Sequence, residues 1–322
     1  MIIKQAEDRN RDIEELTSLL ALPDIDGATK NKITREIKNT QSGIKGEAEA
    51  AYQMNFHFSD SKRWMVIHDL RLEHNGNVAQ IDHLILNRFL EIYVCESKRF
   101  VEGIAINEHG EFSAFYQGKA YGIPSPIEQN ERHITLLKKI FDSGDIELPT
   151  RLGLKMKPKL LSLILIANSA RISRPQSGKN IQGLDRIIKN EQVKNKIDKD
   201  INTENPLSAS ISMAKMISSE TLRSFAESLA ALHQPATINW KARFGIADEP
   251  EAIHASPDMP SENIEKPLES NTAQSKEDKI PHLFCASCKR TVTPTVANFC
   301  WSNKTRFQGK VYCYNCQKRM KE

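Results

Sequence analysis

A carboxylate and an ammonium group share one face of a predicted strand in the first third of the chain. The run LEIYVCESK, residues 90–98, is rich in aliphatic and aromatic residues and is typical of a strand. Residues i and i+2 of a strand point to the same face, so Glu96 and Lys98 point the same way. A pair of this kind is commonly a surface ion pair, and this interpretation stays open on the pair alone.

A second carboxylate lies on the preceding predicted strand, AQIDHLIL, residues 79–86. If the two strands form a hairpin that turns near Phe89, residues whose numbers sum to 178 face each other, and Asp82 faces Glu96. Opposed residues in an antiparallel pair have Cβ atoms about 4.5–5.5 Å apart. A shift of one residue would put the two carboxylates on opposite faces. The hairpin therefore predicts a shared cation site, because a cation relieves the repulsion of like charges.

Oxygen ligands favour a hard cation, so Mg²⁺ or Mn²⁺ is expected at Asp82 and Glu96 rather than zinc. Such an ion lowers the pKa of a bound water and stabilises charge on a phosphate oxygen. A lysine on the same face, Lys98, can orient the attacking water, accept its proton or neutralise the phosphate. These groups predict a site that cuts a phosphodiester.

Four cysteines near the end of the sequence are spaced as two metal-binding knuckles. The pairs Cys285-x-x-Cys288 and Cys313-x-x-Cys316 flank 24 residues. Each pair places two thiolates on a tight turn, and two pairs complete a tetrahedral, structural Zn²⁺ site. Cys300 lies between them and is interpreted as a buried thiol, with an alternative zinc ligand as the second interpretation.

The composition points to a soluble cytoplasmic protein. No apolar run reaches the ~18 residues that span a bilayer, and the first residues turn charged at once, unlike a signal peptide. Residues 276–322 hold ten Lys and Arg against three Asp and Glu, a net charge of +7, and the rest hold 35 against 38, a net charge of −3. The basic tail favours a polyanion as partner, and no membrane partner is expected.

The elements that must position these residues alternate between helices and strands. A charged helical arm is expected first, and its narrow apolar stripe at Ile13, Leu16, Leu19 and Leu20 predicts packing or a homodimer. A helix at GEAEAAYQMNF, the strands around Asp82 and Glu96, one strand in GEFSAFYQGKAY, a helix from Pro126 and the buried strand LLSLILIA follow. This alternation predicts an α/β domain around a mixed sheet.

The chain is expected to divide at changes in composition. Two packing helices are predicted at residues 184–199 and 206–232. Residues 245–280 contain four prolines and no aromatic residue, which is typical of a flexible linker. The predicted parts are a helical arm (1–42), an α/β domain (43–200), a helical extension (201–244), an acidic linker (245–280) and a zinc ribbon (281–322).

Four motifs occur in an order that resembles the nuclease-related domain, NERD: KGEAEAAY, AQIDHLIL, VCESKRF and PSPIEQN, over roughly residues 43–165. NERD is a branch of the PD-(D/E)xK nucleases, so the resemblance implies a restriction-endonuclease-like mixed sheet flanked by helices. It implies that Asp82 and Glu96 hold the metal and that Lys98 is the catalytic lysine. It also implies that Glu47 is an accessory acidic residue and that Gln129 is a polar residue near the site.

Three neighbouring positions complete the comparison. His83 matches the IDH wording of the family and is expected to face away from the metal. Cys95 stands where an apolar residue is usual, and Arg99 stands where asparagine is frequent. Neither departure removes a ligand.

The tail resembles zinc ribbons found after NERD domains and at the C-termini of topoisomerases. The loop between its knuckles mixes aromatic residues with Lys304, Arg306 and Lys310, which suits stacking on bases and contact with phosphates. The competing interpretation is that the aromatic residues form the core of the ribbon. DNA is the expected partner, and RNA is also compatible with these residues.

These observations predict a Mg²⁺-dependent deoxyribonuclease, an endonuclease, recruited to nucleic acid by its zinc ribbon. The alternative is a catalytically silent nucleic-acid-binding or scaffolding protein on a nuclease fold. A third hypothesis is a protein–protein adaptor. The intact set of Glu47, Asp82, Glu96 and Lys98 favours the first hypothesis, because a silent fold has no need to keep carboxylates that repel each other.

Overall fold

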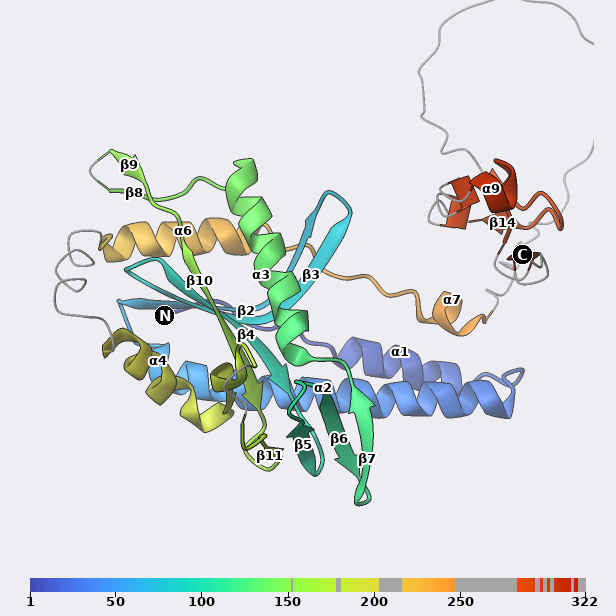
Figure 1. The fold of residues 1–322 in the computed structure, drawn as a ribbon, viewed down its shortest axis with the longest axis horizontal. Coiled ribbons are helices and arrows are strands. Elements are labelled where there is room, and N and C mark those ends of the chain that lie inside the picture. Colours follow the sequence, from blue (N-terminus) through green and yellow to red (C-terminus); the bar gives the residue numbers. More distant parts are fainter. Residues whose placement is uncertain are drawn as a thin grey trace, which may run out of the picture. The chain divides into compact units, whose positions relative to one another are not determined.

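The protein is described by a computed structural model that covers residues 1–151, 153–177, 181–202 and 216–246 (Figure 1). Near the C-terminus it describes residues 283–292, 296–297, 300–301, 304–313 and 316–317. These residues form two compact units, one within residues 1–251 and one within residues 252–322. The acidic linker predicted at 245–280 lies outside the described residues except for its first two positions.

A six-stranded mixed sheet forms the centre of the first unit (Figure 1). The second, third and fourth strands are antiparallel neighbours, whereas the last two run parallel to the fourth. The first strand is parallel to the second. In order across the sheet the strands are β1 (Ile2–Lys4), β2 (Trp64–His74), β3 (Asn77–Asn87), β4 (Glu91–Lys98), β10 (Lys159–Ile166) and β12 (Ile187–Lys189).

Helices cover both faces of this sheet, which confirms the predicted mixed α/β architecture. One face packs against α2 (Gly27–Phe58) and α4 (Val193–Asn202), and the other against α3 (Pro126–Ser143) and α6 (Ser219–Ala231). Side chains of β4 alternate between the two cores: Tyr93 and Cys95 face α2, and Ile92 and Val94 face α3. The β10 segment LLSLILIA contributes to cores on both of its faces, as predicted.

Helix α3 begins where the sequence indicates. Ser125 is its N-cap and accepts a hydrogen bond from the backbone of Glu128, and Pro126 occupies the first turn. Gly144 ends the helix in the left-handed conformation, with a φ of 87°. The predicted helix is therefore confirmed together with its start.

Helix α2 differs from the prediction, because the boundary expected between residues 42 and 43 falls inside it. Asp26 caps its start by accepting a hydrogen bond of 2.7 Å from the backbone of Thr29. From Gly27 to Phe58 the helix contains no proline to interrupt it. It carries buried residues along its whole length, so the arm and the α/β domain share one helix.

The N-terminal apolar stripe packs within the chain. Leu16 and Leu19 of α1 (Asn10–Leu20) are buried with Ile33 of α2 and with Trp240, the first residue of α7 (Trp240–Phe244). The stripe was expected either to pack within the chain or to form a homodimer, and these residues pack within the chain. A homodimer through the same segment stays a prediction.

The segments expected as a helix at 184–199 and as a helical extension at 201–244 differ from the prediction in their structure or packing. Short 3₁₀ turns, η2 (Leu184–Arg186) and η3 (Asn190–Gln192), flank strand β12, and α4 begins only at Val193. Ile187 and Ile188 form a strand because β-branched residues suit the edge of β10, with which they pair. Helix α6 is part of the main core through Phe225, and residues 203–215 lie outside the described part.

A second, four-stranded sheet combines three strands that lie between β4 and α3 in the chain with one strand, β11 (Arg171–Ser173), that follows β10. It has the order β11, β5 (Gly103–Ile106), β6 (Phe112–Tyr116) and β7 (Lys119–Ile123). The single strand expected in GEFSAFYQGKAY is a hairpin, because Gln117 and Gly118 form a tight turn with φ values of 50° and 72°. A small antiparallel pair, β8 (Thr150–Arg151) and β9 (Leu154–Lys155), precedes β10.

The second unit contains β13 (Leu283–Phe284), β14 (Thr291–Val292) and α9 (Lys304–Phe307), and β13 and β14 pair in antiparallel fashion. Its buried core includes Cys285, Val292, Ala297 and Val311. In the described part of the chain, none of the helices combines the length and the apolar character needed to cross a membrane.

Gly46 is the point of closest approach between α2 and the end of β4. A Cβ atom at this position would lie 2.8 Å from the Cβ of Arg99, which is too close, whereas a Cβ at Gly43 would meet only Glu47 Oε1 at 3.7 Å. We expect Gly46→Ala to lower the free energy of unfolding by about 1–3 kcal/mol, because α2 must move away from β4.

The matched control is Gly43→Ala in the same helix. This change is expected to leave stability unchanged or to raise it by up to about 1 kcal/mol, since alanine favours a helix over glycine. Urea unfolding followed by circular dichroism measures both variants. Equal effects of the two substitutions would show that the contact between α2 and β4 has no special role.

Candidate functional site

The β3–β4 hairpin has the register predicted from the sequence. His83 pairs with Cys95 and Leu84 pairs with Val94, so the numbers of paired residues sum to 178. Asp82 and Glu96 are the next positions along the two strands. The Oδ2 of Asp82 accepts a hydrogen bond of 2.7 Å from the backbone N–H of Ser97, so the two strands stay joined just beyond the pair of His83 and Cys95.

One cavity of roughly 400 Å³, here called the carboxylate cavity, is lined by all five residues predicted at the site. Two helices on opposite faces of the sheet, α2 and α3, meet the middle of β3 and the end of β4 there. The structure therefore brings together residues that are far apart in the sequence, while their roles stay predictions: Glu47 from α2, Asp82 from β3, Glu96 and Lys98 from β4, and Gln129 from α3.

Glu96 and Lys98 pair, but not at the surface. Glu96 Oε1 lies 2.6 Å from Lys98 Nζ, and only 2% of Glu96 is exposed. Its other oxygen, Oε2, is buried and has no hydrogen-bond partner among the described residues, although His133 Nδ1 lies 3.5 Å away. A buried carboxylate oxygen without a partner is costly, so this geometry differs from an ordinary surface ion pair.

The carboxylates destabilise each other in their charged forms. Burial raises the pKa of Asp82 well above its usual range, and the nearby charges of Glu96 and Glu47 raise it further. Burial also raises the pKa of Glu47, against the effect of Arg9, whose Nη1 lies 3.7 Å from Glu47 Oε1. The pKa of Glu96 is raised by burial too, and Lys98 opposes the shift. A divalent cation bound here would relieve this repulsion.

The donor set fits Mg²⁺ or Mn²⁺. Asp82 and Glu96 offer hard oxygen ligands, and Mg²⁺ in proteins commonly uses one or two carboxylates while keeping several waters. The three carboxylates are not drawn into a closed cage: among the described residues, the four C-terminal cysteines are the only group of three or more ligands whose atoms all lie within 4.8 Å. An open site leaves room for water and a phosphate.

Sequence reasoning missed several residues around this cavity. Gln80, which lies two residues before Asp82 on the same face of β3, lines it, and strand alternation was the available signal. His133, four residues after Gln129, shares a face of α3 with it, and helix periodicity was the signal. Arg9 carried no such signal, because only the fold brings it to α2.

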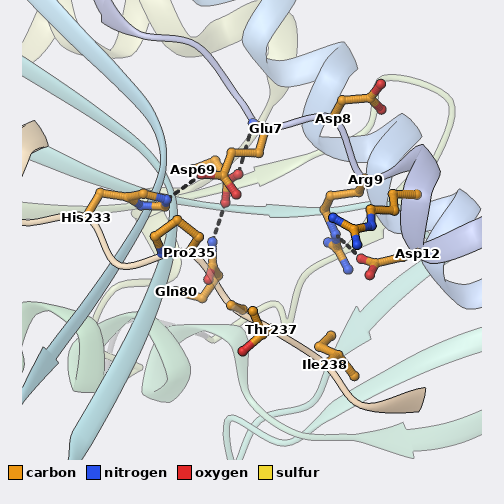
Figure 2. Close-up of a pocket in the computed structure, with 12 residues that line it drawn as sticks. Glu7, Asp8, Arg9, Asp12, Asp69, Gln80, His233, Pro235, Thr237 and Ile238 are labelled. Atoms are coloured by element: carbon orange, nitrogen blue, oxygen red, sulfur yellow. Dashed lines mark hydrogen bonds and ion pairs between the residues drawn. The ribbon is translucent and has the colours of Figure 1, made fainter. Parts of the chain in front are cut away.

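Asp69 breaks the ladder opposite Asp82. His68 pairs with His83 and Leu70 with Ile81, but Asp69 between them has a φ of 53°, unusual for a residue other than glycine. Its Oδ2 accepts a hydrogen bond of 3.1 Å from the backbone of Glu7, and its Oδ1 accepts one from the side chain of Gln80 (Figure 2). Both oxygens therefore have protein partners, which sets Asp69 apart from Glu96.

A second cavity of roughly 390 Å³ lies beside the first and shares Gln80 with it. Figure 2 shows its walls, which come from the N-terminal segment and from residues 233–238. His233 Nε2 lies 2.6 Å from Glu7 Oε1, and its Nδ1 accepts a hydrogen bond of 3.0 Å from the backbone of Arg71. These contacts hold the N-terminal segment beside β2.

His83 faces α2, on the side of the sheet opposite to Asp82. Its Nδ1 lies 2.8 Å from Nδ1 of His68, whose Nε2 lies 3.0 Å from Asn55 Oδ1. Because an amide oxygen only accepts, His68 donates from Nε2 and accepts from His83. His83 Nε2, 3.0 Å from Ser97 Oγ, then accepts from that hydroxyl. This chain of hydrogen bonds fixes the side chain of Ser97, the residue whose backbone binds Asp82.

The four predicted zinc ligands meet in the second unit. The sulfur atoms of Cys285, Cys288, Cys313 and Cys316 all lie within 4.8 Å of one another, and Sγ of Cys288 lies 3.5 Å from Sγ of Cys313. Such a cluster fits the small zinc ribbon that the spacing predicts, since a tetrahedral zinc site needs four thiolates this close.

Cys300 lies outside this cluster. It is fully buried, and its Sγ accepts hydrogen bonds from the backbone of Tyr312, at 3.3 Å, and from Nε2 of Gln317, at 3.2 Å. The interpretation of Cys300 as a buried thiol agrees with these contacts.

Fold and site together define an α/β domain with a cavity of clustered carboxylates, and a separate four-cysteine unit. Residues 42–159 match the family model of the nuclease-related domain, NERD. The match begins inside α2 and ends at the start of β10, so it includes every residue that lines the carboxylate cavity except Asn39. Neither a curated protein nor a solved structure matches this chain.

His68 predicts how stability depends on pH. Burial lowers its pKa to about 4, against about 6.5 in an unfolded chain, so below pH 6.5 the unfolded state binds a proton that the folded state rejects. Above pH 6.5 His68 is neutral in both states and costs no stability. As the pH falls from 6.5 to 4, the free energy of unfolding decreases. We expect His68 to account for a loss of about 2 kcal/mol between pH 7 and pH 5.

In His68→Gln this part of the pH dependence should disappear, whereas His109→Gln, in an exposed turn, should keep it. Urea unfolding at pH 7, 6 and 5 measures the difference. An unchanged slope in His68→Gln would contradict a buried neutral histidine.

The zinc cluster predicts a metal content of one zinc per chain. Cys285→Ser and Cys316→Ser should each lower it severalfold, because a three-thiolate site binds zinc more weakly. Cys300→Ala should keep its zinc, since Cys300 is not part of the cluster. Atomic emission on purified protein measures the content, and loss of zinc in Cys300→Ala alone would contradict this ligand assignment.

Proposed function

We propose that this protein is a metal-dependent nuclease that hydrolyses phosphodiester bonds in DNA, and that its zinc ribbon recruits it to nucleic acid. The observation that carries the proposal is the convergence of Asp82, Glu96 and Lys98 in one cavity, where one buried carboxylate oxygen has no hydrogen-bond partner within the described ranges. The match of residues 42–159 to a nuclease-related family supports the same chemistry. The order of carboxylate, hairpin and E-x-K pair is that of PD-(D/E)xK nucleases.

Asp82 and Glu96 would hold Mg²⁺ or Mn²⁺, which lowers the pKa of a bound water and stabilises charge on phosphate. The N–H of Ser97 orients Asp82 through its hydrogen bond of 2.7 Å. Lys98 Nζ is held 2.6 Å from Glu96 Oε1, so its ammonium group lies beside the metal ligand. From there it can hold the attacking water or the phosphate and take part in proton transfer.

Glu47 and Gln129 would act from the two helices that flank the strands. Glu47 adds a third carboxylate to the cavity, and its contact with Arg9 limits the charge that it contributes. Gln129 brings a neutral amide, which can donate a hydrogen bond to a phosphate oxygen without competing for the metal.

The zinc ribbon supplies the surface for nucleic acid. Phe284 and Trp301 are 55% and 40% exposed, and the cations Lys289, Arg290 and Lys310 are exposed near them in sequence. Aromatic faces that stack on bases and cations that contact phosphates are the means by which small domains bind single strands. The net charge of +7 on residues 276–322 favours the same partner.

The test is cleavage of a closed circular plasmid with Mg²⁺ or Mn²⁺ added. The full chain should nick or linearise the plasmid, and Glu96→Gln and Lys98→Met should each lower the rate about 10²-fold or more, because each removes a group that contacts the metal or the phosphate. Glu131→Gln and Lys138→Met, at exposed positions of α3, are the controls and should cleave at the full rate.

Thermal unfolding of each variant separates lost chemistry from lost folding. DNA binding without product under any divalent ion would favour the silent scaffolding protein instead. A Glu96→Gln protein that cleaves at the full rate would refute the proposed site.

A further inference from the structure

A groove of roughly 470 Å³, here called the α3 groove, adjoins the carboxylate cavity. The outer side of α3 forms one wall, and Asn77 and Val78 of β3 form the other. Gln129 lines both the groove and the cavity, so the two hollows meet at its side chain. His133 also lines the groove, and its Nδ1 lies 3.5 Å from Glu96 Oε2. The groove therefore leads directly to the predicted metal ligands.

The charges of the α3 groove are all positive. Arg132 and Lys139 line it, both are exposed, and no carboxylate lines it. Neither cation has an ion-pair partner within the part of the chain that the structure describes. They lie seven residues apart, which places them on one face of α3 and about 10 Å apart along its axis. This distance is about the rise of three nucleotides in one strand of B-DNA.

The rest of the lining suits a phosphate backbone. Asn77, Gln129 and Thr135 offer neutral hydrogen-bonding groups in the same groove, and proteins contact phosphates with amide and hydroxyl groups of this kind. The three carboxylates that line the neighbouring cavity would repel an acidic protein segment, whereas a nucleic acid brings a phosphate that the metal site itself requires. The positive charge of the groove and its connection to the carboxylate cavity thus favour a nucleic-acid backbone over an acidic protein segment.

We propose that the α3 groove binds the sugar–phosphate backbone of the nucleic-acid strand that enters the carboxylate cavity, with Arg132 and Lys139 as phosphate contacts. This inference rests on the proposed nuclease function for the direction of the strand. It assigns a substrate-binding role to residues outside the metal site.

Photo-crosslinking of the full chain tests the location of the strand. A p-benzoyl-phenylalanine side chain introduced at Thr135, inside the groove, should crosslink to a labelled oligonucleotide, whereas the same side chain at Lys138, exposed but outside the groove, should not. The two positions lie three residues apart on the same helix, so any binding of the oligonucleotide by the zinc ribbon contributes equally to the crosslinking of both samples. Equal crosslinking at the two positions, or none at Thr135, overturns the proposal.

Binding of the same oligonucleotide, measured by fluorescence anisotropy with no divalent ion added, tests the two cations. Arg132→Gln/Lys139→Gln should bind roughly 10-fold more weakly, and the slope of log K against log salt should fall by about 1.8, or 0.9 for each lost phosphate contact. Lys138→Gln/Lys157→Gln removes the same charge outside the groove and should change the slope much less. Identical slopes for the two variants contradict the proposal.

The two proposals fail separately. If the chain crosslinks at Thr135 but cuts no substrate with any divalent ion, the α3 groove stands and the nuclease does not. If the chain cleaves DNA while the groove variant binds, crosslinks and cleaves like its control, the groove alone is refuted. Binding of an acidic protein in place of nucleic acid would likewise overturn the inference.

Discussion

The structure of this domain depends on carboxylates that are buried side by side at the end of one hairpin. The register of β3 and β4 places Asp82 and Glu96 together, where burial and mutual repulsion raise the pKa of both. The protein offsets part of this cost with the ammonium group of Lys98 and the N–H of Ser97. One oxygen of Glu96 still has no partner among the described residues. The remaining imbalance is what a divalent cation would relieve.

The rest of the fold holds this hairpin end between two helices from opposite faces of the sheet. Helix α2 approaches β4 closely because Gly46 has no side chain, and this contact brings Glu47 to the cavity. Helix α3 begins at Pro126 after the N-cap Ser125, and its first turn brings Gln129 to the cavity from the face of the sheet opposite to α2. Behind the strands, neutral histidines fix Ser97. Packing and the hydrogen bonds of these histidines therefore position the strands, while Ser97 and Lys98 contact the carboxylates directly.

The two units offer donor sets that suit two different roles of a metal ion. Few residues are buried in the described part of the second unit, and four thiolates within 4.8 Å can supply through zinc the folding energy that a small core lacks. The carboxylate cavity adjoins a much larger core, and its oxygen ligands are not drawn into a closed cluster. In general, a structural site is closed and often uses soft thiolate donors. A catalytic site keeps an open position and often uses hard oxygen donors.

The sequence by itself determined what local patterns encode. Strand alternation and a short hairpin fixed the register that brings Asp82 next to Glu96. The two CxxC pairs fixed the cysteine cluster, and Ser125 with Pro126 fixed the start of α3. Only the tertiary structure decided that residues 187–189 form a strand, that α2 continues through residue 42, and that Arg9 reaches Glu47. The α3 groove likewise exists only where α3 crosses β3. These features arise from contacts between segments distant in the chain, and no local periodicity records which distant partner a segment will meet.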